Sequence, residues 1–135
     1  MIEITEKPIS PEFVVNRVKT DDSGCVVTYV GLIRQYSRGK QVTSVEYRDP
    51  ERLAAGRLQR IADEARRRWQ LENVAITHRT GKLKVGDINL VVAVASAHRK
   101  EGFAASQYII DAFKQTIPTH KIETYQDGST HIEGE

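Results

Sequence analysis

The stretch Ile88–Glu123, INLVVAVASAHRKEGFAASQYIIDAFKQTIPTHKIE, decides the fold. Its apolar run Leu90–Val94 predicts a strand that is buried on both faces. A helix is expected directly after it, because apolar positions recur at intervals of three and four residues. These positions are Phe103, Ser106, Ile110, Phe113 and Ile117. Pro118 is expected to end this helix.

Cation-capable side chains gather near both ends of that helix. His98, Arg99 and Lys100 follow the strand, Lys114 falls in the last helical turn, and Lys121 lies just past the helix terminator. A strand end that leads into a helix start commonly binds an anion. A single loop cation is usually solvated, and a Lys suits the negative end of a helix dipole. The cluster, rather than any one member, therefore indicates an anion site.

Length and composition bound the class of protein. The 135 residues suffice for one domain with a substantial core, expected over residues 1–135. The net charge of +2 gives no general affinity for nucleic acid. No signal peptide or membrane span is evident, so a cytoplasmic protein is expected.

Cysteine and histidine usage argues against a metal site. The one cysteine, Cys25, excludes an internal disulfide framework, and its apolar surroundings favour a core residue. His98, His120 and His131 are too scattered to match metal-ligand spacing. No glycine motif of the nucleotide-binding folds is present. The residues by themselves therefore predict no metal site.

Strand and helix signals precede the central stretch. Ile2–Lys7 is expected to form a short edge strand, and Ser10 to cap a short helix that begins with Pro11. Cys25–Arg34 is a second apolar strand, in which Gly31 indicates a bulge or a close backbone approach. The polar loop that follows carries two cations, and a plain hairpin tip is favoured over a lid.

The next elements return to the core. Val42–Tyr47 is expected to be a strand, and the longest helix is expected to open at Asp49 with an apolar stripe. The stripe is Ala54, Leu58, Ile61, Ala65 and Trp69. Asn73–Arg79 alternates as a strand that carries His78, interpreted as a satisfied core residue. A turn-rich connection over Thr80–Asp87 leads into the central stretch.

The C-terminal residues predict a hairpin. Lys121–Tyr125 and Thr130–Glu133 are expected to pair across an Asp-Gly turn. Together these elements predict an α+β fold, with three helices and a mixed, mostly antiparallel sheet.

Several separated stretches, in order and with compatible spacing, resemble the large, catalytic subunit of molybdopterin synthase. They are Gly24–Arg34, Asp63–Trp69, His78–Gly81, Val85–Asp87, Ser96–Arg99 and Phe113–Lys121. The likeness covers about Gly24 to Glu133 and implies an α/β-hammerhead-like fold.

The resemblance also implies a reaction and partners. Members of that family are sulfurtransferases, which install the dithiolene of molybdopterin in cyclic pyranopterin monophosphate during molybdenum cofactor biosynthesis. The sulfur arrives as a thiocarboxylate on the C-terminal Gly-Gly tail of a small ubiquitin-like sulfur-carrier subunit. The assembly implied is a heterotetramer around a homodimer of large subunits, without nucleic acid or membrane. No metal or organic cofactor is implied, since the nucleophile arrives on the partner.

The resemblance assigns roles to six residues of this chain. Arg34, His98 and Arg99 are implied to contact the phosphate and the pterin, and Arg68 is a further basic candidate. Lys114 is implied to be the central catalytic residue, and Lys121 to stabilise developing charge. Arg suits bidentate phosphate contacts and Lys suits proton donation.

The chain departs from the family at its C-terminal end. His120 and His131 stand where tryptophans are usual, Ile122 replaces a basic residue, and the chain ends at Glu135 without a basic tail. Three other functions are compatible with the residues. One is a non-catalytic anion- or nucleotide-binding module on the same fold, and a second is an RNA-binding domain. The third is a subunit that binds the small partner but has lost the chemistry.

Overall fold

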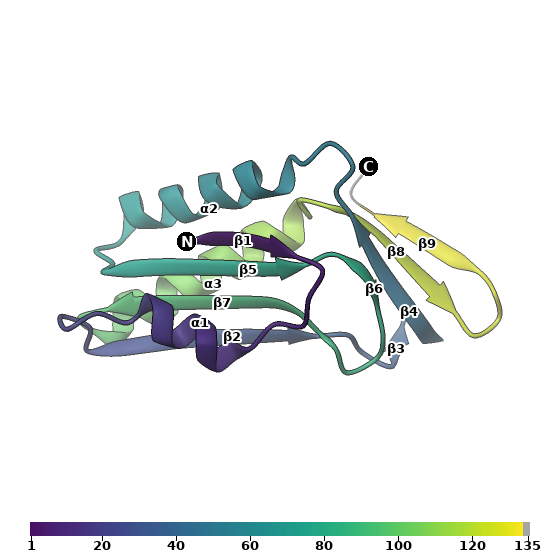
Figure 1. Ribbon diagram of the computed structural model, residues 1–135, viewed down its shortest axis with the longest axis horizontal. Helices are drawn as coiled ribbons and strands as arrows, with labels where there is room; N and C mark the ends of the chain where they lie inside the picture. The colour runs from purple at the N-terminus through teal and green to yellow at the C-terminus, as the bar shows by residue number, and fades with distance from the viewer. Residues whose placement is uncertain (134–135) are drawn as a thin grey trace.

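The α+β prediction is confirmed by the computed structural model, which describes residues 1–133 (Figure 1). Gly134 and Glu135, and with them the chain end noted above, lie outside the described residues. Within residues 1–133, none of the helices is long and apolar enough to cross a bilayer.

The first sheet has the order β1 (Ile2–Thr5), β5 (Asn73–Arg79), β7 (Ile88–Ser96) and β2 (Cys25–Leu32). β1 runs parallel to β5, and the other neighbours are antiparallel. The predicted edge strand at the N-terminus is therefore confirmed. β7 lies inside the sheet and is buried on both faces from residue 90 to residue 96, as its apolar run predicts.

Helices cover both faces of this sheet. α2 (Ala54–Arg68) and α3 (Arg99–Gln115) pack on one face, against the even-numbered residues of β7. α1 (Pro11–Val18) packs on the other face, against the odd-numbered residues. Figure 1 shows α1 in front of the sheet and α3 behind it. β7 thus fixes the start of α3, and α3 carries Lys114 to the opposite end of the sheet.

The second sheet lies at one end of the first (Figure 1). It contains β3 (Tyr36–Ser37), β4 (Lys40–Arg48), β8 (His120–Tyr125) and β9 (Thr130–Glu133), with β6 (Gly81–Leu83) paired to β4. The predicted C-terminal hairpin is confirmed as β8 and β9. The turn-rich connection expected before β7 also contains the short strand β6, which was not predicted from the sequence. The sheet's small core is Ile33, Val42, Val45, Tyr47, Leu83 and Tyr125.

Two helix predictions need correction. The longest helix is α3, with 17 residues, because α2 begins only at Ala54 and has 15. Asp49 still caps α2 from a distance, since its carboxylate accepts hydrogen bonds from the backbone N–H groups of Leu53 and Ala54. Phe103 is 62% exposed, because the helix instead packs Gly102 against β2. A Cβ at Gly102 would lie 2.9 Å from Ser96 Oγ and 3.0 Å from a Val27 methyl group, so these side chains would have to shift to admit another residue.

The loop between β3 and β4 is a tight hairpin, as favoured. Arg38 and Gly39 both have positive φ, which suits a two-residue turn between antiparallel strands. Arg38 donates to Glu133, and the ammonium of Lys40 lies 3.0 Å from Asp127. Both loop cations are thus engaged by the β8–β9 hairpin.

Candidate functional site

A cavity of about 460 Å³ opens where the two sheets meet, and it brings Arg34, Lys114 and Lys121 together. These three residues come from separate elements. Arg34 follows β2, Lys114 lies in the last turn of α3, and Lys121 belongs to β8. None of the three forms a salt bridge with another described residue. The cavity therefore holds three cationic groups that are free to meet an anion.

A β-bulge at the end of β2 determines how the chain leaves the sheet just before Arg34. The register of β2 against β7 shifts between Gly31 and Leu32, as the glycine indicated. A Cβ at Gly31 would lie 2.9 Å from the Asn89 Oδ1 atom, so a larger residue here would require the Asn89 side chain to move. Ile33 then donates to the Asp87 carbonyl, which fixes the chain just before Arg34.

The two lysines are placed by buried neighbours. Phe113 is buried in the wall of the cavity and directly precedes the exposed Lys114. Lys121 is half-buried and pairs with Tyr47 across β4 and β8. The ammonium groups thus extend from a rigid wall rather than from a loop.

The wall also contains a carboxylate that the sequence did not single out. Glu123 is buried, with its Oε1 atom 3.4 Å from the Tyr125 hydroxyl that donates to it and 3.9 Å from Arg38 Nε. Because side chains two apart on a strand share a face, Glu123 lies on the same side of β8 as Lys121. This Lys-x-Glu spacing is the signal that could have identified it.

Tyr47 and Asn89 add neutral polar groups to the cavity. Burial raises the pKa of Tyr47 to about 12, against the opposing effect of the hydrogen bond from Asn89. The phenol therefore keeps its proton at neutral pH. Since its oxygen accepts from Asn89 Nδ2 at 3.1 Å, its O–H group remains available as a donor.

His98 and Arg99 do not line this cavity. They are exposed at the opposite end of α3, where Ser96 Oγ donates to the His98 carbonyl at 2.7 Å. Lys114 follows Arg99 by 15 helical positions, and at about 1.5 Å per residue the two Cα atoms are roughly 22 Å apart. One chain therefore presents the predicted basic residues as two separate groups.

Arg68 also lies outside the cavity. It is the last residue of α2, and its Nε atom donates to Glu64 at 3.0 Å. Its guanidinium stands 4.5 Å from the centre of the Tyr108 ring. The structure thus gives Arg68 local partners, and its role in substrate binding stays a prediction.

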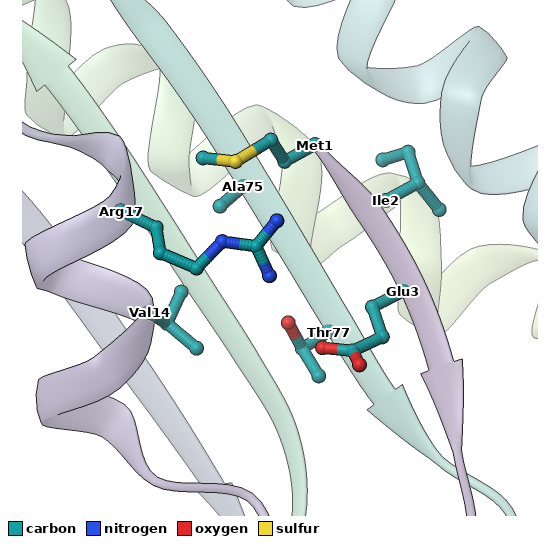
Figure 2. A pocket seen from close by; sticks show the side chains of 7 residues that line it. All are labelled: Met1, Ile2, Glu3, Val14, Arg17, Ala75 and Thr77. Carbon is teal, nitrogen blue, oxygen red and sulfur yellow. The ribbon is translucent and has the colours of Figure 1, made fainter.

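A second cavity, of about 230 Å³, lies between α1 and the β1–β5 pair (Figure 2). Figure 2 shows Arg17 reaching from α1 toward Glu3 and Thr77, with the Met1 side chain above. None of the six predicted site residues lines it. In residues 1–133, no group of three or more His, Cys, Asp or Glu side chains is arranged to hold a metal ion.

His78 is a buried core residue, as interpreted from the sequence. Its Nδ1 atom lies 2.8 Å from the Asn89 carbonyl oxygen and its Nε2 atom 3.0 Å from Thr119 Oγ1. Burial lowers the pKa of His78, and this outweighs the opposing effects of the Asn89 hydrogen bond and the Asp49 charge. The imidazole is therefore neutral at pH 7.

This neutral histidine predicts a pH-dependent stability. Below about pH 6.5 the unfolded chain protonates His78 while the folded chain does not, so stability falls as pH decreases. The expected contribution has a slope of up to about 1.4 kcal/mol per pH unit. Urea unfolding of the wild type and His78→Gln between pH 7.5 and 5 measures it, with His131→Gln as control. An equal pH dependence in wild type and His78→Gln would contradict the prediction.

Comparison with known proteins identifies relatives along most of the chain. The model of the MoaE protein family matches residues 4–116. The curated "Molybdopterin synthase catalytic subunit" of Bacillus subtilis (strain 168) is 36% identical over 130 residues, covering 96% of this chain and 83% of that protein.

Solved structures show the same fold. The crystal structure of molybdopterin synthase from Staphylococcus aureus matches with a TM-score of 0.89 at 31% identity, covering 98% of this chain and 96% of that one. A complex of subunits 1 and 2 of molybdopterin-converting factor from Helicobacter pylori 26695 matches with a TM-score of 0.73, covering 99% and 90%. At 14% identity, the second likeness shows the fold alone.

Proposed function

Because this chain belongs to the MoaE protein family, we propose that it acts as the catalytic subunit of a molybdopterin synthase and transfers sulfur to cyclic pyranopterin monophosphate. The observation that carries the proposal is the convergence of Arg34, Lys114 and Lys121 on one cavity. Both reactants are anions, since one carries a cyclic phosphate and the other a thiocarboxylate. Three cations without salt-bridge partners among the described residues suit such a pair.

Each sulfur transfer needs proton movement at the cavity. The thiocarboxylate sulfur forms a bond to a side-chain carbon of the pterin, and the oxygen that leaves this carbon takes a proton from Lys114. Water then attacks the acyl carbon, the acyl–sulfur bond breaks, and the donor tail ends as a carboxylate. Lys121 stabilises the charge on the tetrahedral oxyanion. Two such transfers give the dithiolene without an oxidant, so the scheme calls for no cofactor.

The sulfur donor in this proposal is the Gly-Gly tail of a small ubiquitin-like subunit. Val30 and Leu32 line the cavity, lie on the edge strand β2, and are 37% and 57% exposed. An edge strand with apolar side chains suits an extended tail, which pairs with the backbone and covers those side chains. This surface leads directly to Arg34.

The distance between the two basic groups supports a homodimer. If His98 and Arg99 contact the substrate, they must come from a second copy, because in their own chain they lie at the far end of α3. His98 is the N-cap and Arg99 the first residue of the long helix α3, whose dipole also attracts phosphate at this end. The proposed heterotetramer places one small subunit at each of two such sites. A cytoplasmic location stays a prediction.

Substrate binding gives the first test. Arg34→Ala is expected to weaken the affinity for cyclic pyranopterin monophosphate by about tenfold to a hundredfold, since a charge-assisted phosphate contact is lost. Isothermal titration of the wild type, Arg34→Ala and the control Arg60→Ala, which changes an exposed arginine of α2, measures it. Equal affinities for all three proteins would show that the substrate does not bind in this cavity.

A further inference from the structure

The segment that joins the two lysines is anchored at its centre. Lys114 ends α3, Lys121 lies in β8, and the chain between them passes through Pro118 and Thr119. Both of these residues are buried, with Thr119 only 1% exposed. Arg57 of α2 donates to the Pro118 carbonyl at 3.2 Å. This segment is therefore the direct backbone connection between the two lysines, and it is fixed to the protein interior.

The anchor of Thr119 is His78, and its proton arrangement follows from its partners. The Asn89 carbonyl oxygen can only accept, so His78 Nδ1 carries the proton and donates at 2.8 Å. In the neutral ring, Nε2 is then an acceptor. The Thr119 hydroxyl, 3.0 Å away, therefore donates to it. The hydroxyl is held in one direction inside the protein.

The imidazole also packs against residues beside both lysines. Its ring meets Phe113, which precedes Lys114, edge-on at 5.1 Å between ring centres. It also meets the ring of Tyr47 edge-on at 4.8 Å between ring centres, and Tyr47 pairs with Lys121 across the sheet. A single buried side chain thus contacts the supports of both cations.

We propose that His78, acting through Thr119, is a positioning residue that sets the relative placement of the Lys114 and Lys121 ammonium groups. Its consequence for catalysis rests on the proposed sulfur transfer, whereas the placement itself belongs to the free protein. The reaction needs both cations around one thiocarboxylate, and a displacement of about 1 Å at such a site can slow a reaction strongly. A purely structural role would instead lower stability without a specific effect on turnover.

Thr119 offers a matched pair of substitutions. Thr119→Val keeps the shape and removes the hydroxyl, and Thr119→Ser keeps the hydroxyl. For Thr119→Val, we expect kcat to fall about tenfold with KM changed less than about twofold, as for the loss of an orienting hydrogen bond. Thr119→Ser is expected to retain turnover within about twofold of wild type. Equal kcat losses in the two variants, or no loss in folded Thr119→Val, would overturn the proposal.

A second readout needs no catalysis. The ¹H–¹³C signals of the Lys114 and Lys121 Cε groups, assigned with Lys→Arg variants, are expected to shift in Thr119→Val and not in Thr119→Ser. Unchanged lysine signals in folded Thr119→Val would overturn the positioning role. If Thr119→Val does not fold, Thr119→Ala removes the same hydroxyl and takes its place. A wild type that makes no product would sink the sulfur-transfer proposal, while the lysine signals still decide on positioning.

Discussion

Lys114→Ala is expected to lower the rate of molybdopterin formation by a thousandfold or more. Loss of the proton donor accounts for a factor of about 10²–10⁴, and loss of the positive charge lowers the rate further. Lys114 is exposed, so its removal should change the free energy of unfolding by less than about 0.5 kcal/mol. The variant should therefore still fold and still bind the small subunit.

A single-turnover assay with thiocarboxylated small subunit and saturating cyclic pyranopterin monophosphate measures this loss. Lys19→Ala is the matched control, because Lys19 is an exposed lysine at the end of α1 and does not line the cavity. No product from the wild type, with Lys114→Ala only weakening the affinity for substrate, would favour the non-catalytic anion-binding module. A full rate in Lys114→Ala would place the chemistry on another group.

Mixing two inactive variants is expected to restore activity. Arg99→Ala alone should lose about a hundredfold or more in rate, because a charged phosphate contact is removed. If each site combines Lys114 of one copy with Arg99 of the other, a dimer of Lys114→Ala with Arg99→Ala contains one intact site. Random mixing makes half of the dimers mixed, so about a quarter of the wild-type activity should return.

Co-expression of the two variants with different affinity tags isolates the mixed dimers. These purified dimers are expected to reach about half of the wild-type rate, since one of two symmetric sites is intact. The control combines Lys114→Ala with Lys121→Ala, which damage the same cavity and should not complement. If the mixed dimers of Lys114→Ala with Arg99→Ala are no more active than either variant alone, then both groups act within one chain, or Arg99 takes no part in the reaction.

Local signals predicted much of the first sheet. These signals act over only a few residues. The apolar run predicted strand β7, the cap and proline predicted the start of α1, and Gly31 predicted the bulge in β2. The role of His78 as a core residue was also readable, because a histidine that alternates with apolar residues in a strand is most often buried.

Long-range pairing could not be read in the same way. β6 has three residues and exists because β4 offers hydrogen-bond partners far away in the chain. The face that α3 turns toward the sheet is the one that carries Gly102, which packs against β2. The periodicity of apolar residues placed Phe103 on the buried face, although its side chain is exposed. Tertiary packing decided both features.

The candidate site was predicted only in part for a geometric reason. His98 and Arg99 lie close to Lys114 in sequence, which favoured one basic cluster, but a straight helix separates them by roughly 22 Å. Arg34 and Lys121 lie far apart in sequence and meet Lys114 in one cavity. The pairing of β4 with β8 places the buried residues Glu123 and Tyr47 in the wall of that cavity, and the sequence did not reveal this pairing.

The most direct test of sulfur transfer follows the sulfur atom itself. The wild-type protein is mixed with cyclic pyranopterin monophosphate and a small subunit whose thiocarboxylate carries ³⁴S. The mass of the product is then measured by mass spectrometry. We predict molybdopterin with two ³⁴S atoms, and a donor tail returned as the carboxylate. A folded protein that binds the labelled small subunit but yields no labelled product would contradict the account, and would direct attention to His120, Ile122 and His131.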